Sequence, residues 1–295
     1  MASEAVHETA DAAPLADARE PVRHGRTLIR RHSALVRITH WINVVCLTVL
    51  LMSGLQIFNA HPALYWGAYS DFAHPVLSMT AEQRGDASRG VTTVLGHRFD
   101  TTGVLGVSAD AQGHPWARGF PAWATLPGQQ ALAEGRLWHF FFAWLFVMNG
   151  AVYLLAGLFG GHLWRDLVPS GRQLRRIGRT AWEHLLFRFP KGAEARRYNV
   201  LQQLAYLIVM FGVLPFIVLA GLAMSPRMDA AFPWLLDLFG GRQSARTVHF
   251  ILAWLLVAFV LVHVFMVLVS GVWNNVRSMI TGRYAIEEER DAAHG

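Results

Sequence analysis

Four long stretches without a charged side chain constrain this chain more than any other feature of its sequence. They cover residues 38–70, 137–164, 198–226 and 247–276, and they are 33, 28, 29 and 30 residues long. A helix needs about 20 mostly apolar residues to cross a bilayer, so each stretch can hold one transmembrane helix. A core helix of a soluble protein is shorter and keeps a polar face.

We therefore predict four transmembrane helices, at about 38–58, 137–159, 201–224 and 248–273. Backbone groups in lipid must satisfy their hydrogen bonds internally, which makes helices the expected spanning elements. The predicted fold class is an all-α membrane protein built as a four-helix bundle.

The low content of charged residues agrees with this fold class. Only 16% of the residues are charged, against roughly 25% in an average soluble domain. The net charge of +6 would also suit a nucleic-acid-binding protein. Because the charge-free stretches favour a lipid bilayer as the surroundings of the chain, we expect no nucleic-acid partner.

The distribution of arginine predicts the orientation of the helices. The loop 165–197 holds nine basic residues and three acids, whereas residues 59–134 hold four basic residues and six acids. Loops rich in Lys and Arg stay in the cytoplasm, so 165–197 is predicted to be a basic inner loop. Four spans return the chain to its starting side, and both termini are then cytoplasmic.

The chain is expected to form one helical domain, residues 32–283, between two tails. Residues 1–31 mix five acids with five arginines and are predicted to be a disordered tail, and residues 284–295 are predicted to be a C-terminal tail. The long outer loop, 59–136, is rich in proline and aromatic residues, which favours a folded cap on the outer face.

Four histidines lie in or at the edge of the predicted helices: His40, His139, His249 and His263. Ionisable residues inside transmembrane helices are rare and are usually functional. The four predicted helices contain no Asp, Glu, Lys or Arg, so a proton pathway or a di-metal carboxylate site would lack its usual ligands. The remaining chemistry is that of imidazole, which binds haem iron.

The spacing of the histidines indicates two metal sites. His249 and His263 are 14 residues apart, which places both rings on nearly the same face of a helix and about 21 Å apart along its axis. One haem cannot bridge that distance, but two stacked haems can. By topology, His139 can pair with His249 near the outer face, and His40 can pair with His263 on the inner side. The depths of the second pair match less well, because His263 lies near the middle of its predicted helix.

Short motifs around these histidines resemble those of a known family. Residues 37–43, Arg-Ile-Thr-His-Trp-Ile-Asn, and residues 137–140, Leu-Trp-His-Phe, resemble the first-helix and second-helix motifs of bacterial di-haem cytochrome b subunits. The spacing of His249 and His263 is similar to that of the family's fourth helix. This family includes the membrane subunits of nickel–iron hydrogenases, formate dehydrogenase and thiosulfate reductase, and the resemblance covers about residues 30–283.

The resemblance implies two b-type haems in a multi-pass protein of the bacterial inner membrane. His139 and His249 would hold the outer haem, and His40 and His263 the inner one. The family passes electrons between membrane quinone, an exchangeable substrate, and a periplasmic oxidoreductase subunit. The resemblance favours a molybdopterin oxidoreductase as that partner, with a hydrogenase second. A homodimer is compatible with the sequence.

A quinone site needs an apolar slot with a few hydrogen-bond donors. Asn43 lies one turn from His40, and three more candidates lie at the inner end of the fourth helix: Ser270, Asn274 and Asn275. Arg37 is a candidate for binding a haem propionate or for shaping the quinone pocket, although a membrane-surface anchor is an equal interpretation. Asparagines at helix ends also serve as caps.

Two further groups of residues have alternative interpretations. The outer-loop aromatics form either a docking surface or a cap packed over the outer haem, and they are Tyr65, Trp66, Tyr69, Trp116 and Trp123. The outer-loop histidines are rivals for a metal site, and they are His61, His74, His97 and His114.

The function has two alternatives as well. The first is a stand-alone quinol-oxidising cytochrome b that works without a partner subunit. The second, from another class, is a haem-free transporter or scaffold bundle, in which His40 and His139 would belong to interfacial belts beside their neighbouring tryptophans.

Overall fold

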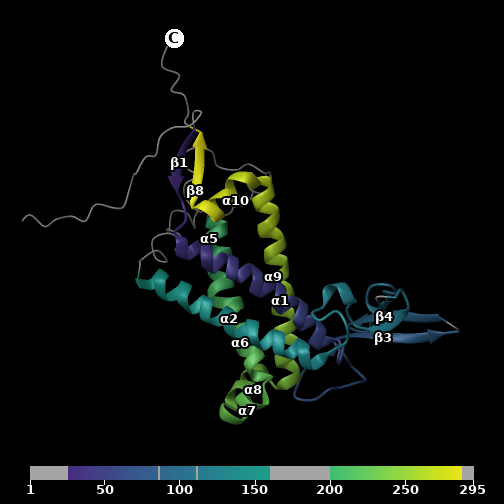
Figure 1. The fold of residues 1–295 in the computed structure, drawn as a ribbon. Helices are drawn as coiled ribbons and strands as arrows, with labels where there is room; N and C mark the ends of the chain where they lie inside the picture. The colour runs from purple at the N-terminus through teal and green to yellow at the C-terminus, as the bar shows by residue number, and fades with distance from the viewer. Residues whose placement is uncertain (1–25, 86, 111, 160–199, 288–295) are drawn as a thin grey trace, which may run out of the picture.

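The structure is a computed structural model that describes residues 26–85, 87–110, 112–159 and 200–287 (Figure 1). The predicted basic inner loop 165–197 lies outside the described residues, as do most of the two predicted tails.

Four helical segments are long and apolar enough to span a membrane, as the sequence predicted. They are α1 (Ala34–Phe58), α2 (Leu132–Phe159), the composite segment Val200–Ala223 and α9 (Arg242–Val269). Many large apolar side chains of these helices are exposed on the protein surface, as lipid-facing side chains are, and examples are Leu137, Phe141, Trp144, Ile208 and Leu261.

The observed helix ends have local causes. Ser33 caps α1, because its backbone is extended and its Oγ accepts a hydrogen bond from the Val36 N–H at 3.3 Å. The helix therefore begins four residues before the predicted start at residue 38. The α9 helix ends at Val269, before the predicted 273, because Gly271 adopts a φ of 104°. The chain then continues as α10 (Val272–Thr281).

The third span is not a uniform helix. It consists of α5 (Val200–Ile208), a π-helical turn η4 (Val209–Val213) and α6 (Leu214–Ala223). Pro215 has no N–H, and its ring would clash with the carbonyl group four residues earlier, so the helix widens just before it.

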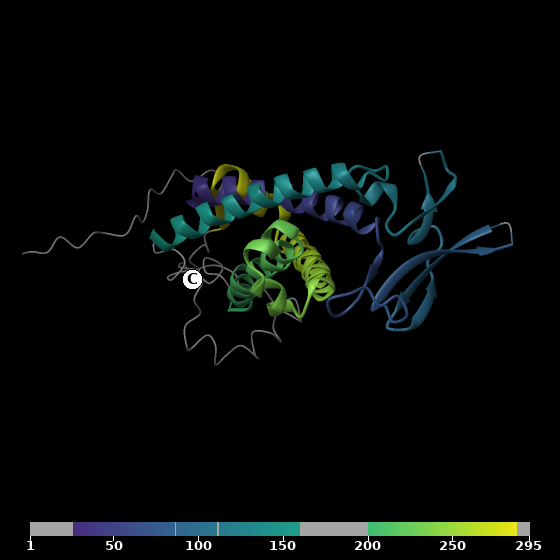
Figure 2. The ribbon, with the colours of Figure 1, turned by 90° about the horizontal axis from the view of Figure 1, so that it is seen from below.

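The spans form two layers. The α1 and α2 helices pack along each other in one layer, and α6 packs against α9 in the other. Seen from below, α1 and α2 cross over the second pair (Figure 2).

The outer loop contains β-structure that the all-α prediction missed. Four strands form a sheet in the order β2-β3-β4-β5, and β6 pairs with β7. The strands are β2 (Ala63–Leu64), β3 (Leu77–Arg84), β4 (Ala87–Val94), β5 (His97–Asp100), β6 (Gly106–Ala109) and β7 (Pro115–Arg118). The β6 strand lies so close to β4 that a Cβ atom at Gly90 would lie 2.2 Å from the Leu105 carbonyl oxygen. The two sheets therefore pack directly on each other.

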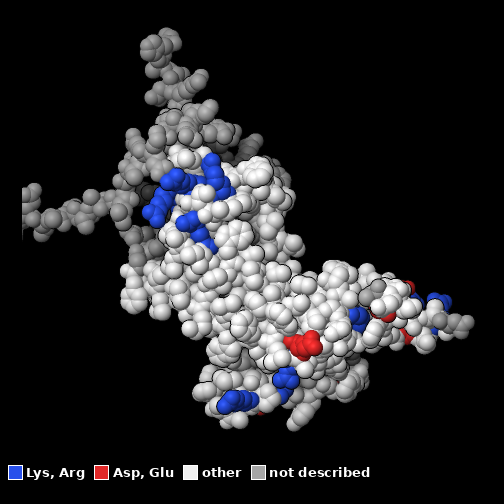
Figure 3. All heavy atoms as spheres, in the orientation of Figure 1, with Lys and Arg blue, Asp and Glu red and all other residues white. Residues whose placement is uncertain are grey.

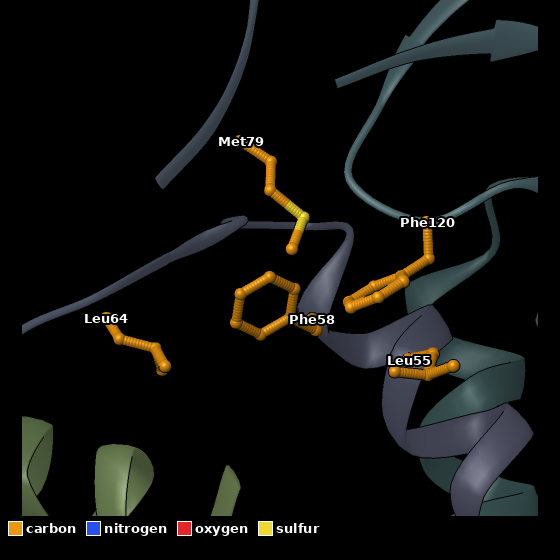
Figure 4. Packing of buried hydrophobic residues seen from close by; sticks show 5 residues of the cluster. All are labelled: Leu55, Phe58, Leu64, Met79 and Phe120. Carbon is orange, nitrogen blue, oxygen red and sulfur yellow. The ribbon is translucent and has the colours of Figure 1, made fainter. Parts of the chain in front are cut away.

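The β-structure is attached to the end of α1. Asn59, which follows α1, donates a hydrogen bond to the Phe120 carbonyl (3.1 Å) and accepts one from the Phe120 N–H (2.6 Å). A buried apolar cluster packs around this junction (Figure 4), and it consists of Leu55, Phe58, Leu64, Met79 and Phe120. We call this side of the molecule the loop end. The short helices η1 (Ala122–Ala124), α7 (Pro226–Ala231) and α8 (Trp234–Phe239) complete the connections there.

The opposite end carries a two-stranded ribbon, and we call it the ribbon end. The β1 strand (Arg26–Arg30) pairs antiparallel with β8 (Arg283–Glu287), with Arg30 opposite Arg283. The predictions of tails at 1–31 and 284–295 are therefore wrong for these residues. Gly282 (φ 82°) turns the chain after α10 and brings residues 283–287 alongside β1, so each short strand has a partner. In Figure 3, arginines gather at the ribbon end, and the middle of the spans shows no charged side chain on that face.

Candidate functional site

The four span histidines come together as two pairs. The ring centres of His139 on α2 and His249 on α9 lie 6.2 Å apart, with 62° between the ring planes. The ring centres of His40 on α1 and His263 on α9 lie 6.4 Å apart, with 57° between the planes. We call these the loop-end pair and the ribbon-end pair. They join the same residues that the topology of the sequence predicted to be partners.

The helix ends remove the mismatch in depth that the sequence suggested for the ribbon-end pair. His40 lies six residues after the start of α1, and His263 lies six residues before the end of α9. Both differ from the predicted positions because α1 starts earlier and α9 ends earlier than predicted. In the same way, His139 and His249 each lie seven residues after the start of their helices.

The separation within each pair fits a metal ion between the rings. An imidazole nitrogen lies roughly 1.1 Å from the ring centre and binds a metal at about 2.0 Å, so two rings holding one ion from opposite sides have centres about 6.2 Å apart. The measured separations of 6.2 and 6.4 Å agree. Each pair can therefore supply both axial ligands of one haem iron.

Hydrogen bonds determine which ring nitrogen carries the proton in the two loop-end histidines. The Nδ1 of His249 lies 2.9 Å from the Ile217 carbonyl oxygen, which can only accept. The Nδ1 of His139 lies 3.1 Å from Ser53 Oγ, and that hydroxyl donates to the Val49 carbonyl at 2.6 Å. Both rings therefore carry their proton on Nδ1 and keep the Nε2 lone pair for a metal. Such orienting hydrogen bonds are typical of histidine ligands.

Two glycines make room for the loop-end rings. A Cβ atom at Gly54 on α1 would lie 3.3 Å from Cε1 of His139, and a Cβ atom at Gly221 on α6 would lie 3.3 Å from Cε1 of His249. Each ring is thus backed by the bare backbone of a neighbouring helix. This close approach lets α1 and α6 hold the two rings in place.

The ribbon-end rings pack against aromatic side chains. The His40 ring meets Trp41 edge-on at 5.4 Å, and the His263 ring stacks on Phe259 at 6.3 Å with 17° between the planes. In the described residues, the buried Nδ1 of His40 has no hydrogen-bond partner. The ribbon-end rings are therefore held by packing more than by hydrogen bonds.

Asn149 on α2 is a residue of this site that the sequence analysis missed. It is buried, and its Nδ2 donates to the Thr39 carbonyl and to Asn43 Oδ1, both at 2.8 Å. These two acceptors flank His40 on α1, so the hydrogen bonds of Asn149 fix the position of His40 along the interface between α1 and α2. The signal available in the sequence was a lone amide within an apolar span.

We expect Asn149→Leu to lower the thermal stability of the protein. The change leaves the Thr39 carbonyl and the Asn43 amide without their donor, at a cost of about 1–3 kcal/mol. Thermal unfolding followed by far-UV circular dichroism measures the effect. The matched control is Met148→Leu at the neighbouring, exposed position. Equal unfolding temperatures for the two variants would contradict a structural role of Asn149.

The other polar candidates already have partners at the ribbon end. Arg37 Nη1 donates to the Ile280 carbonyl, and Asn43 Oδ1 accepts from Asn149. Asn274 pairs with the backbone N–H and carbonyl of Ala285. Asn275 Nδ2 donates to Ser270 Oγ at 2.9 Å. Asn43 thus links α1 to α2, Asn274 links α10 to β8, and Asn275 bonds the turn between α9 and α10.

A segment of the outer loop, residues 61–70, lies across the start of α9, and we call it the strap. The N–H groups of Gln243 and Ser244 both donate to the Gly67 carbonyl at 3.1 Å. Thr247 Oγ1 donates to the Tyr65 carbonyl at 2.7 Å, and Arg246 Nη2 donates to the His61 carbonyl at 2.5 Å. The strap therefore caps α9 and covers the helix turns just before His249.

The outer-loop aromatics are mostly exposed, and the outer-loop histidines do not gather into a metal site among the described residues. Tyr65 is buried, whereas four of the predicted aromatics are exposed, namely Trp66, Tyr69, Trp116 and Trp123. In the part of the chain that the structure describes, no three His, Cys, Asp or Glu side chains gather to hold a metal ion. His74 and His114 instead lie beside Asp71 and Asp110.

Comparison with known proteins identifies relatives over nearly the whole described region. The model of a family described as prokaryotic cytochrome b561 matches residues 31–282. A protein named putative protein-methionine-sulfoxide reductase subunit YedZ1, from Azospira oryzae, is 31% identical over 236 residues, which cover 80% of this chain and 89% of the relative. No solved structure matches.

Proposed function

This chain belongs to the prokaryotic cytochrome b561 family, and from that membership we propose that it passes electrons between membrane quinone and an oxidoreductase subunit outside the cytoplasmic membrane. Membership makes the chain a membrane haem protein of electron transport. The observation that carries the proposal is that two histidine pairs each take one ring from α9, one near its loop end and one near its ribbon end.

We assign one b-type haem to each pair. Bound b-type haem supplies one-electron transfer, and with histidine at both axial positions it has no open site for a substrate. The loop-end pair is oriented by Ser53 and by the Ile217 carbonyl. Because α9 would carry one ligand of each haem, with the two ligands 14 residues apart, it would hold the two binding sites about 21 Å apart along its axis.

We place the quinone site at the ribbon end. An apolar groove lies there between α1 and α10, and it is lined by Ala34, Arg37, Ile38, Trp41, Ile42, Met279 and Ile280. Trp41 Nε1 donates to the Met279 carbonyl at 3.1 Å, which holds the two walls together. A flat apolar ring with polar edges suits such a groove.

The partner is placed at the loop end, which we orient towards the periplasm with both termini in the cytoplasm. Arginine-rich segments at the ribbon end support this orientation. The exposed aromatic side chains of the loop end suit a protein interface. The name of the Azospira relative describes a putative protein-methionine-sulfoxide reductase subunit, which favours a reductase over a hydrogenase, and we propose a molybdopterin oxidoreductase as the partner class.

Purified protein is expected to contain about two b-type haems per chain and to be reduced by a quinol analogue. Haem is counted from the absorbance of its pyridine complex, and reduction is followed in the visible spectrum. A colourless preparation without iron would support a haem-free bundle instead.

Purification from native membranes separates the remaining alternatives. A chain that purifies without a partner subunit and oxidises quinol with a soluble oxidant would be a stand-alone cytochrome.

A further inference from the structure

Arg246 is a partly buried charged residue of the loop end that lies close to a proposed haem ligand. It lies three residues before His249 on α9, which places it on the same side of the helix and one turn nearer the loop end. The residue is partly buried. A guanidinium at this depth is costly unless acceptors surround it.

The contacts of Arg246 leave most of its donors unused. Within the described residues, its guanidinium donates one hydrogen bond, to the His61 carbonyl, and lies 5.3 Å from the centre of the Phe58 ring. No carboxylate of the described residues forms an ion pair with it. A guanidinium has five N–H donors in a planar fork.

Arg118 shows how this chain satisfies a buried arginine that serves structure alone. Its guanidinium donates to the Phe120 carbonyl at 2.6 Å, to the Gly128 carbonyl at 2.9 Å and to Thr125 Oγ1 at 2.9 Å. Three acceptors from the loop surround it. Arg246 has one acceptor, so its fork remains available to an anion.

A second polar group lies beside Arg246. Nε2 of His61 is buried and has no hydrogen-bond partner among the described residues. The His61 ring stacks on Tyr65, with 5.7 Å between the ring centres. Burial, and then the charge of Arg246, lower the pKa of His61, so the ring is neutral at pH 7 and carries one N–H to donate.

We propose that Arg246, with His61 as a second donor, binds a propionate carboxylate of the haem held by His139 and His249. A planar guanidinium matches a carboxylate with two parallel hydrogen bonds. A charged propionate is least costly where it points away from the lipid core, and Arg246 lies on that side of His249. The inference rests on the proposed function, because it assumes a haem at the loop-end pair.

Arg136 offers a matched control. It too lies three residues before a loop-end histidine, His139, but it is exposed, and its guanidinium lies over the Phe140 ring at 5.6 Å. Arg246→Gln and Arg136→Gln therefore each remove one positive charge, and each charge lies three residues before one of the two loop-end histidines. Only the first removes the proposed carboxylate partner.

The test is a redox titration of the purified variants, with the loop-end haem identified as the wave that His249→Ala removes. Loss of Arg246 favours the oxidised haem, because a nearby positive charge and a neutralised propionate both stabilise the reduced form. We expect the ratio of reduced to oxidised loop-end haem at fixed potential to fall about tenfold in Arg246→Gln, a shift of 59 mV for one electron. Arg136→Gln is expected to change it less than twofold, and His61→Phe by an intermediate factor.

A second measurement covers the case in which Arg246→Gln does not accumulate. Resonance Raman spectra report hydrogen bonding of the haem propionates directly, and the propionate band should move in Arg246→Lys, which keeps the charge but loses the fork. An unchanged band in Arg246→Lys, or equal potentials in the two glutamine variants, would overturn the inference. If the inference on Arg246 is overturned but the wild-type protein contains two haems, the proposed function stands. If the wild-type protein contains no haem, the proposed function itself is refuted.

Discussion

Replacement of His249 by alanine is expected to lower the haem content from about two to about one per chain. In the proposed assignment His249 would supply one of the two ligands of the loop-end haem, and His139 alone would be a weak anchor. The ribbon-end pair lies about 21 Å away along α9 and should keep its haem. Because electrons then cannot cross the bundle, reduction of an acceptor at the loop end by quinol should fall to the background rate.

The measurement is haem per protein from the pyridine complex, combined with that acceptor assay. His97→Ala is the control. His97 lies on the exposed strand β5, so this substitution removes a histidine without changing a span. An unchanged haem content in His249→Ala would refute the ligand assignment. Loss of both haems from a folded protein would refute the independence of the two pairs.

The second large effect is expected from adding side chains at the glycines behind the loop-end rings. In Gly221→Val, the new methyl groups must occupy space beside Cε1 of His249, which lies only 3.3 Å from an ideal Cβ atom. The ring must turn, and it loses its hydrogen bond to the Ile217 carbonyl. Loss of such an orienting contact typically costs 10–100-fold in affinity, so we expect the loop-end haem to be lost during purification.

Gly54→Val should have the same effect through His139, because the geometry at that ring is the same. Gly212→Val is the control within the third span, since no atom outside the adjoining helix backbone lies within 4 Å of a Cβ atom there. Haem content and the electron paramagnetic resonance signal of low-spin iron are the measurements. Equal haem content in Gly221→Val and Gly212→Val would show that the close approach does not matter.

The spans could be predicted because each is a local property of the sequence. An absence of charge over about 30 residues requires no knowledge of the rest of the fold. The pairing of His249 with His139 followed equally from helix geometry and chain direction. The start of α1 was harder, because it depends on one hydrogen bond of Ser33 rather than on hydropathy.

The roles of Gly221 and Asn149 could not be predicted, since each depends on what a distant helix places opposite. The sequence has six glycines in or near the predicted spans, and nothing in the sequence alone distinguishes Gly221 from the others, which are Gly54, Gly150, Gly157, Gly212 and Gly271. One hydrogen-bond acceptor of Asn149 is a backbone carbonyl. Every residue has such a carbonyl, so no sequence motif identifies it. Four strands of the outer loop were missed because they have only two to four residues. The eight-residue strand β3 was missed because most of it is exposed, so its sequence lacks an alternating apolar pattern.

Each histidine pair takes one ring from α9, which is synthesised after the other three spans. Because translation runs from the N-terminus, α1 and α2 enter the membrane carrying only half of each site. A chain that stops before residue 249 has no complete pair, and one that stops between 249 and 263 has one. With one haem assigned to each pair, as proposed, we expect a chain truncated before residue 249 to bind no haem and one truncated between residues 249 and 263 to bind one.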